Sequence, residues 1–416
     1  MDALQAQADA VAALVSRLLR PLIDQRLSVV FYDLTTIRAE GLSEQPGELR
    51  RFGLAKEGVI ARQCLLSVAQ TAEGLPIALR VSGGNVAETA TLASAIAEVT
   101  PNYPVQRIIL VADRGLLSVG NLATLDALKV ADGPLEYIVA VPGRRYAEFV
   151  QVLAEMQPLC VVAGVAAAAE VVGEVPWSPA RAKEASVKRL VWAHDPARAN
   201  EQSQQRQVRM HALLARAEQC VVKLDAQDAG QTAKGRKLSD AGAKARLYHE
   251  VIEARLGRII EVDLKHEQLS WKINEDHLAQ AQLMDGKLLL VTNVADLTPT
   301  EVVQRYKSLA DIERGFHVLK SEIEIAPMCH RLPDRIRAHA LICFIALVLH
   351  RVMRMRLLAA GNKHSPERAL ALLRQLQRHR IHLTDDQTVI GLSSVSAEQA
   401  ELFTSLKLPK PSVKNI

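Results

Sequence analysis

The sequence predicts an α/β fold in which a mixed sheet is flanked by helices. Two short apolar segments, residues 27–33 and 107–113, are rich in strand-forming residues, and each ends in an aspartate. Such segments are typical of strands buried on both faces of a sheet. A third acid, Glu313, lies about 200 residues further along, in a segment with helical periodicity.

The predicted elements follow one another in a definite order. Ala72-Glu73-Gly74 is a short glycine-containing turn between two strands, and Ser118 is a candidate N-cap. In chain order we expect strands over residues 27–33, 62–70 and 75–82, a helix over 87–99, a strand over 107–113, a helix over 118–131 and a strand over 135–141. Three strands, a helix, a strand, a helix and a strand, followed by a distant helix, is the order of the ribonuclease H-like fold.

The distant helix is predicted to begin near Pro299. Thr298 supplies an N-cap hydroxyl, Pro299 takes the first helical position, and Glu301 follows three residues after the cap. These three residues satisfy orphan amides and set the angle at which the chain enters the helix. The same periodicity is expected to continue without a break through Lys320.

Glu313 is predicted to lie on the inward face of this helix. Tyr306, Glu313 and Lys320 are seven residues apart, so at about 100° per residue they fall within roughly 40° of one another. A carboxylate on an apolar face is costly unless it is paired or binds a cation. Glu313 therefore requires a partner, whereas Asp311 points to the opposite, solvated side. The apolar residues on the inward stripe are Val302, Leu309 and Phe316.

A divalent metal shared with Asp33 and Asp113 is one such partner. Both aspartates are expected at strand ends, followed by the turn or capping residues Thr35-Thr36 and Arg114-Gly115. If the two strands are neighbours, a spacing of about 4.8 Å lets the carboxylates share ions set about 3.5–4 Å apart. A strand-end aspartate taken alone is most often a turn or capping residue. Two of them in this order, together with Glu313, favour a metal site.

On these stretches the chain resembles a DDE transposase of bacterial insertion sequences, over roughly residues 27–358. The branch it resembles has the signature Tyr, two residues, Arg, three residues, Glu, six residues, Lys, and Leu309 stands at the Arg position. The matching stretches are Tyr32-Asp33-Leu34-Thr35-Thr36, Ala112-Asp113-Arg114-Gly115, and the helix with Tyr306, Glu313 and Lys320.

The resemblance implies a metal-dependent DNA reaction. Asp33, Asp113 and Glu313 would be both catalytic and metal-binding residues, holding two Mg²⁺ ions, with Mn²⁺ as a substitute. The reaction would be phosphodiester hydrolysis at transposon ends and strand transfer into target DNA. The implied partners are the terminal repeats, the target DNA and a second copy of the chain in a homodimer. A metal nuclease that cuts without joining and a catalytically inactive DNA-binding remnant are the alternatives.

Residues near the acids are candidate DNA contacts. On the acidic helix these are Tyr306, Lys307, Arg314 and Lys320, for which packing or a lysine lying along the helix surface is the alternative. Residues 230–246 form a basic loop that could bind the DNA backbone or simply be solvated surface. Its basic residues are Lys234, Arg236, Lys237, Lys244 and Arg246.

An inserted α+β subdomain is expected before the last acid, because 200 residues separate Asp113 from Glu313, against 80 between Asp33 and Asp113. Core packing is favoured for the three tryptophans of this region. The predicted segments are an N-terminal helical segment over 1–26, the catalytic domain over 27–142 and 287–358, the insertion over 143–286, and a C-terminal helical region over 359–416. Only 32 residues precede Asp33, whereas similar proteins carry a DNA-recognition domain there, so a truncated form is expected.

Composition is compatible with this interpretation. The 416 residues carry a net charge of +5, which suits a mildly basic DNA-binding protein. The five cysteines form no CxxC pair, which disfavours a disulfide framework or a zinc site. The longest apolar run, residues 340–349, is too short for a membrane span, and no glycine cluster fits a nucleotide cofactor. We expect a bacterial cytoplasmic protein, associated with the nucleoid when acting, and assign no metal role to its histidines.

Overall fold

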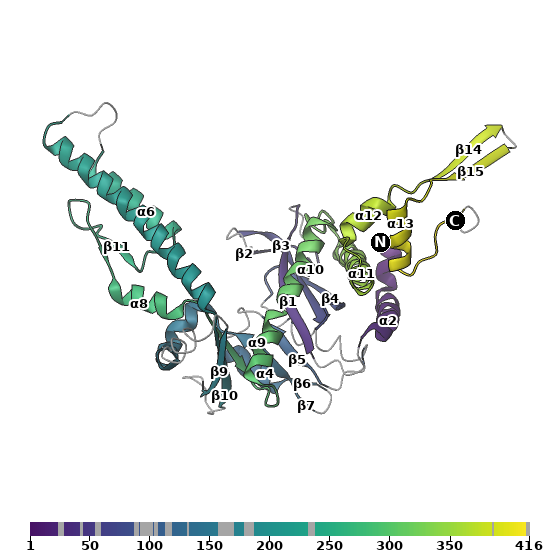
Figure 1. The fold of residues 1–416 in the computed structure, drawn as a ribbon, viewed down its shortest axis with the longest axis horizontal. Helices are drawn as coiled ribbons and strands as arrows, with labels where there is room; N and C mark the ends of the chain where they lie inside the picture. The colour runs from purple at the N-terminus through teal and green to yellow at the C-terminus, as the bar shows by residue number, and fades with distance from the viewer. Residues whose placement is uncertain are drawn as a thin grey trace. The chain divides into compact units, whose positions relative to one another are not determined.

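The computed structural model divides into two compact units (Figure 1). The first comprises Met1–Val139, Asn293–Ala295 and Gln304–Ile416, and the second Ala140–Thr292 and Asp296–Val303. The structure describes residues 1–23, 29–41, 45–54, 60–86, 91, 103, 107–112, 119–130, 133–156, 170–178, 187–231, 238–384 and 387–412.

A mixed sheet forms the centre of the first unit, which confirms the predicted fold class. Its strand order is β2-β3-β1-β5-β8, and β4 pairs with β3. β1 is antiparallel to β3 and parallel to β5, and β5 is parallel to β8. The strands are β1 (Val29–Arg38), β2 (Arg51–Leu54), β3 (Ile60–Thr71), β4 (Pro76–Gly83), β5 (Ile109–Ala112) and β8 (Glu136–Ala140). The short pair β6 (Lys129–Val130) and β7 (Gly133–Pro134) is separate.

Burial explains why these segments form strands where the sequence predicts them. Every residue of β5 is buried, as are the last four residues of β8. Parallel strands covered on both faces require such continuous apolar runs. The predicted hairpin is also present, because β3 and β4 are antiparallel and Gly74 adopts the positive φ of 77° that its turn requires. The helix expected over residues 87–99 falls almost wholly outside the described residues.

Helices cover this sheet. α10 lies against β1, and α11 lies against β4. Leu75, the residue before β4, packs with Leu19, Phe344 and Val348 in one apolar cluster. The N-terminal segment, expected as a single helix, is broken at Gln7. The helices of this unit are α1 (Asp2–Ala6), α2 (Ala8–Leu19), the 3₁₀ helix η1 (Arg20–Leu22), α4 (Val119–Ala127), α10 (Ala310–Ser321), α11 (Pro333–Ala359), α12 (Pro366–Leu373) and α13 (Ala397–Ser405).

The acidic segment is two helices, so the prediction of one continuous helix is wrong. α9 (Pro299–Lys307) ends before Ser308, and α10 begins at Ala310. The Leu309 amide donates to the Tyr306 carbonyl, a three-residue contact that tightens the turn, and the Ser308 hydroxyl bonds to the Gln304 carbonyl. The 100° count from Tyr306 therefore does not carry across to Glu313. The predicted start is confirmed, since Thr298 and Glu301 bond reciprocally.

The C-terminal region contains a β-hairpin that the sequence did not predict. α12 ends at Leu373, and β14 (Arg378–Thr384) pairs antiparallel with β15 (Gln387–Leu392) (Figure 1). Arg378 and Arg380, expected on a helix, therefore belong to a strand. α12 and α13 instead pack on α11 through Leu357, Leu372 and neighbouring apolar residues.

The second unit contains three antiparallel neighbouring strands and a helical arm. The strand order is β13-β10-β9, and β11 pairs with β12. α6 and α7 pack together, and their apolar stripes meet β11 and β12 in one core. The elements are the 3₁₀ helix η3 (Gly143–Phe149), β9 (Val171–Trp177), β10 (Lys188–His194), α6 (Pro196–Asp228), α7 (Asp240–Glu253), β11 (Ile260–Val262), β12 (Trp271–Ile273), α8 (Glu275–Met284) and β13 (Lys287–Thr292).

The tryptophans of this unit pack in or beside its apolar layers. Trp192 is buried, and a Cβ added at Gly173 would overlap its ring. Trp177 stacks on Phe149 with ring centroids 5.3 Å apart, and Trp271 packs half-buried against the core of the arm. These contacts confirm the core-packing interpretation. No helix in the described ranges is long and apolar enough to cross a membrane.

Candidate functional site

Asp33 lies inside β1, so the prediction that it stands at a strand end is wrong. β1 continues to Arg38 because β3 pairs with it along that length, with Asp33 opposite Val68 and Arg38 opposite Gln63. Thr35 and Thr36, expected to form a turn or cap, are strand residues, which suits their β-branched side chains. The first acid is thus held on a rigid element, with backbone pairing on both sides of it in sequence.

β5 brings the second aspartate motif beside the first. β1 and β5 are parallel neighbours, and Phe31 pairs with Val111. The expectation that the two strands are adjacent is therefore confirmed. β5 is described as far as the buried residue Ala112, whereas Asp113 lies outside the described residues.

α10 carries Glu313 in its first turn and approaches the sheet two residues later. A Cβ added at Gly315 would lie 2.8 Å from Gln70 Nε2 and 3.4 Å from Arg351 Nη2. Gln70 is fully buried and pairs with Phe31, two residues before Asp33 along β1. The glycine thus lets the helix of the third acid come close to the part of the sheet that holds the first. The side chains of Asp33 and Glu313 are outside the described part of the structure.

The candidate DNA contacts differ in exposure. Lys307 and Arg314 are exposed, and Tyr306 and Lys320 are half-buried. Lys234, Arg236 and Lys237 lie outside the described residues.

Lys244 does not belong to an open basic loop, which corrects that part of the prediction. It is buried in α7, where its ammonium donates to the carbonyl of Glu267 at 3.2 Å and to that of His266. Arg246 is an exposed residue of the same helix. The helix begins at Asp240 because Ser239 caps it by accepting from the Gly242 amide.

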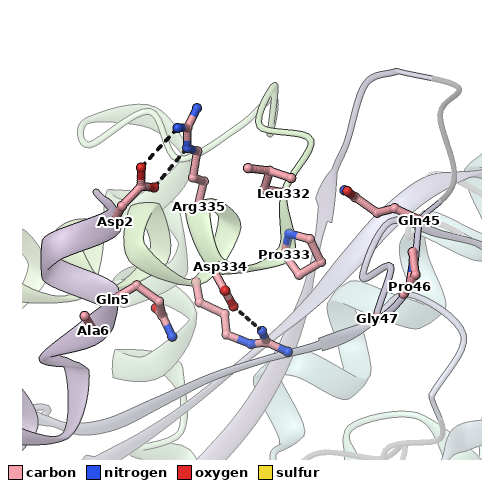
Figure 2. Close-up of a pocket in the computed structure, with 11 residues that line it drawn as sticks. Asp2, Gln5, Ala6, Gln45, Pro46, Gly47, Leu332, Pro333, Asp334 and Arg335 are labelled. Carbon is pink, nitrogen blue, oxygen red and sulfur yellow. Dashed lines mark hydrogen bonds and ion pairs between the residues drawn. The ribbon is translucent and has the colours of Figure 1, made fainter.

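A cavity of about 800 Å³ lies where α1 meets the start of α11 (Figure 2). Its two arginines, Arg335 and Arg337, lie at the start of α11. Arg335 donates to Asp2 at 3.0 and 3.1 Å, and Arg337 donates to Asp334 at 3.0 Å. The hydrogen bond from Arg335 lowers the pKa of the Asp2 carboxyl. Both arginines of the cavity are therefore paired with carboxylates at the start of α11 and in α1.

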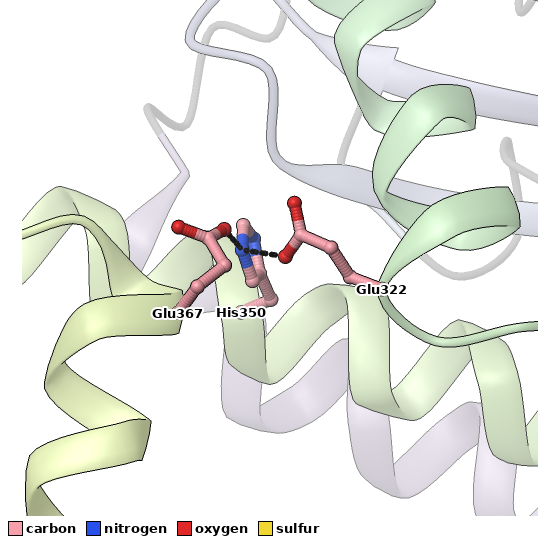
Figure 3. A group of neighbouring side chains, drawn as sticks. All are labelled: Glu322, His350 and Glu367. Carbon is pink, nitrogen blue, oxygen red and sulfur yellow. Dashed lines mark hydrogen bonds and ion pairs between the residues drawn. The ribbon is translucent and has the colours of Figure 1, made fainter.

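Three ionisable side chains, those of Glu322, His350 and Glu367, meet at the C-terminal end of α10 (Figure 3). His350 Nε2 lies 2.7 Å from Glu367 Oε1 and 3.3 Å from Glu322 Oε2. Burial raises the pKa of Glu322 to about 7, and a hydrogen bond to Glu367 adds to this effect. Burial acts in the same sense on Glu367, but hydrogen bonds from Glu322, Ser365 and His350 outweigh it and lower the pKa of Glu367 to about 2.

Sequence reasoning missed this cluster and assigned His350 no metal role. Its members come from three helices, and 28 and 17 residues separate them along the chain. No local spacing motif could have shown their proximity. Glu367 alone has a role that local sequence indicates: it follows Ser365-Pro366 in the first turn of α12, where an acidic side chain stabilises the start of a helix.

Comparison with known families gives one result. A family model described as the transposase DDE domain matches residues 24–349. The match spans more than half of the chain and includes β1, β5 and α10. A search of curated proteins found no match.

Proposed function

Because the chain belongs to the family of transposase DDE domains, we propose that it cleaves DNA at the ends of a transposable element and joins the freed ends to target DNA. The observation that carries this proposal is the family match over a segment that includes β1, β5 and α10. Of the three acids predicted from the sequence, Asp33 belongs to β1, Glu313 belongs to α10, and Asp113 follows the last residue of β5 in the chain. We also propose that the catalytic domain comprises residues 27–142 and 287–358, with residues 143–286 as an insertion between its two parts.

Asp33, Asp113 and Glu313 are the proposed metal-binding and catalytic residues. Support comes from the backbone: Asp113 follows Ala112 directly, and the strand that ends at Ala112 is the parallel neighbour of β1. Neighbouring strands lie about 4.8 Å apart, which is within the reach of two carboxylates that share ions. The close approach of α10 at Gly315 supports the third member of the set.

Three carboxylates suit hard cations such as Mg²⁺, with Mn²⁺ as a substitute. Two such ions, when bound, would supply activation of a water or 3′-hydroxyl and stabilisation of the leaving oxygen in an in-line displacement. The role of the protein would be to hold the three carboxylates on or next to β1, β5 and α10, so that their positions need little adjustment when the ions bind. One phosphodiester is exchanged for another in strand transfer, so no nucleotide cofactor is needed.

Basic side chains near this site would position the DNA. We propose phosphate contacts for Lys307, Arg314 and Lys320 and a positioning role for Tyr306, together with the basic stretch that contains Lys234, Arg236 and Lys237. The exposure of Lys307 and Arg314 supports the first part. Acting on two ends at once calls for two copies of the chain, so a homodimer is proposed, working on the nucleoid in the bacterial cytoplasm.

A cleavage and joining assay tests the function. The purified chain is incubated with Mg²⁺ and a labelled duplex that carries the DNA flanking its gene, and a second duplex with a pre-cleaved 3′ end reports joining. We expect nicking of the first duplex, joining of the second, and loss of both in Asp113→Ala. The control is Asp311→Asn, an acidic neighbour of Glu313 outside the proposed set, which should retain both activities.

The alternatives give different results in the same assay. Cutting without joining would identify a metal nuclease and overturn the transposase proposal. Binding of the flanking DNA without cutting would identify an inactive remnant. Equal cutting by Asp113→Ala and the parent chain would show that the proposed acids do not carry the reaction.

A further inference from the structure

Three helices of the first unit direct one donor group each to a single point (Figure 3). Glu322 is the C-cap residue of α10, His350 lies in α11, and Glu367 stands in the first turn of α12. One nitrogen and two carboxylate oxygens lie within 4.8 Å of one another. All three side chains therefore point at a volume the size of one ion.

The cluster holds two carboxylates beside one imidazole, and Glu322 and Glu367 are hydrogen-bonded to each other. Two carboxylates approach the same imidazole nitrogen, at 2.7 and 3.3 Å, and carboxylates this close repel unless a proton or a cation lies between them. The imidazole is 8% exposed, whereas Glu322 and Glu367 are 29% and 42% exposed. The nitrogen is thus fixed in the protein, while the carboxylate side is open to an ion from solvent.

We propose that Glu322, His350 and Glu367 bind a divalent transition-metal ion of the Zn²⁺ class. An imidazole nitrogen with two carboxylate oxygens suits Zn²⁺ and its first-row neighbours, whereas Mg²⁺ prefers oxygen donors alone. Ligand atoms at about 2.0–2.2 Å from a tetrahedral ion are roughly 3.3 Å apart. The Glu322 oxygen already lies 3.3 Å from His350 Nε2, and the Glu367 oxygen, at 2.7 Å, would move outward to that value when an ion binds. Three protein ligands leave a position for water.

This site is separate from the proposed catalytic acids. Glu322 follows Glu313 by nine residues, which is about 13 Å along a helix axis. An ion here would join the end of α10 to α11 and α12, and so hold the helix on which Glu313 is carried. Its role is positioning, and its existence does not depend on the proposed DNA reaction.

Metal titration of the full chain tests the site. The Glu313→Gln chain serves as the parent, so that the proposed catalytic acids contribute less to binding. We titrate Co²⁺, followed by its visible absorption, then displace it with Zn²⁺, and record thermal unfolding with and without Zn²⁺. We expect one equivalent of tight binding and an unfolding midpoint that rises with Zn²⁺.

Glu367→Gln, added to this parent, should weaken binding at least tenfold and remove the rise in midpoint, since even outer-shell changes at metal sites cost about 10- to 100-fold. His249→Ala is the matched control. His249 Nδ1 lies 3.5 Å from Glu253 Oε2, with both side chains exposed at 72% and 68%, and this pair belongs to no cluster of three donors among the described residues. Its loss should leave Co²⁺ affinity unchanged.

Two results would overturn the proposal. One is a parent chain that shows no saturable Co²⁺ or Zn²⁺ binding, and the other is Glu367→Gln binding as tightly as the parent. Glu322→Gln is a second variant and should also weaken Co²⁺ binding. It is preferred to His350→Ala, because glutamine keeps the shape of the glutamate side chain whereas alanine at the buried position 350 would leave a cavity. Binding is the readout throughout, so a chain inactive on DNA would still give a decisive result.

Discussion

Replacing Glu48 by glutamine should strongly destabilise the first unit, because it removes the carboxylate that pairs with the buried Arg50 guanidinium. The Glu48 and Arg50 side chains are both 0% exposed. Glu48 Oε1 accepts from the Arg50 amide at 3.0 Å and from Nε at 2.9 Å, and Oε2 accepts from Nη2 at 2.7 Å. Glutamine keeps the shape of the side chain but removes its negative charge and one of its two acceptor oxygens.

The expected cost follows from the burial. Removing one partner of a buried pair costs about 3–5 kcal/mol, and the bond from Arg50 to the Glu40 carbonyl at 2.9 Å does not replace the lost negative charge. Asp334→Asn is the control, since its partner Arg337 and its own side chain are largely exposed, and such pairs contribute about 0–1 kcal/mol. Replacing both partners, in Glu48→Leu with Arg50→Met, should cost less than Glu48→Gln alone.

Guanidinium unfolding followed by circular dichroism measures these differences, with hydrogen exchange of β2 and β3 to locate the loss. Tryptophan fluorescence would report the wrong unit, because Trp177, Trp192 and Trp271 all belong to the second. A Glu48→Gln chain within 1 kcal/mol of the parent would refute the reasoning. So would a double variant less stable than the single one.

The pH dependence of the unfolding free energy gives a second test of the Glu48–Arg50 pair. The hydrogen bond from Arg50 lowers the pKa of Glu48 below its ordinary value of 4.5. The pair therefore contributes its full stability above that ordinary value and loses it as the pH falls toward the lowered pKa. The unfolding free energy should fall more steeply below about pH 4.5 in the parent than in Glu48→Gln.

Three further substitutions have expected outcomes in thermal or chemical unfolding. Gly286→Ala should destabilise by about 1–3 kcal/mol, because φ is 65° and an added Cβ would overlap the Asp195 carbonyl; an unchanged melting curve would contradict this. Leu247→Ala should cost about 2–5 kcal/mol in the core of the arm, against about 0.5 or less for the exposed Val208→Ala. Ser396→Ala should cost about 1 kcal/mol by removing a capping box, and a loss below measurement error would count against that assignment.

The elements that could be predicted are those whose sequence pattern and burial agree. β5 and β8 are short apolar runs because both faces are covered, and the α9 start is a capping box that acts locally. Local chemistry and tertiary structure point the same way at these places, so composition and periodicity were sufficient.

The failures arise where tertiary contacts override local preference. The segment around Leu309 has helical residues on both sides, yet Leu309 is buried and a three-residue turn separates two helices. Asp33 looked like a strand end because the apolar run stops there, but pairing with β3 extends β1 to Arg38. The cluster at His350 depends on three helices meeting, which no single stretch of sequence encodes.

Iron-mediated cleavage of the polypeptide tests most directly whether Asp33, Asp113 and Glu313 share a metal. The Glu367→Gln chain is loaded with Fe²⁺ and treated with ascorbate and peroxide, and the cut positions are identified by mass spectrometry. Our account predicts backbone cuts near residues 33, 113 and 313 together, all suppressed by Mg²⁺. Cuts near only one of these acids, or cuts that Mg²⁺ does not suppress, would contradict it.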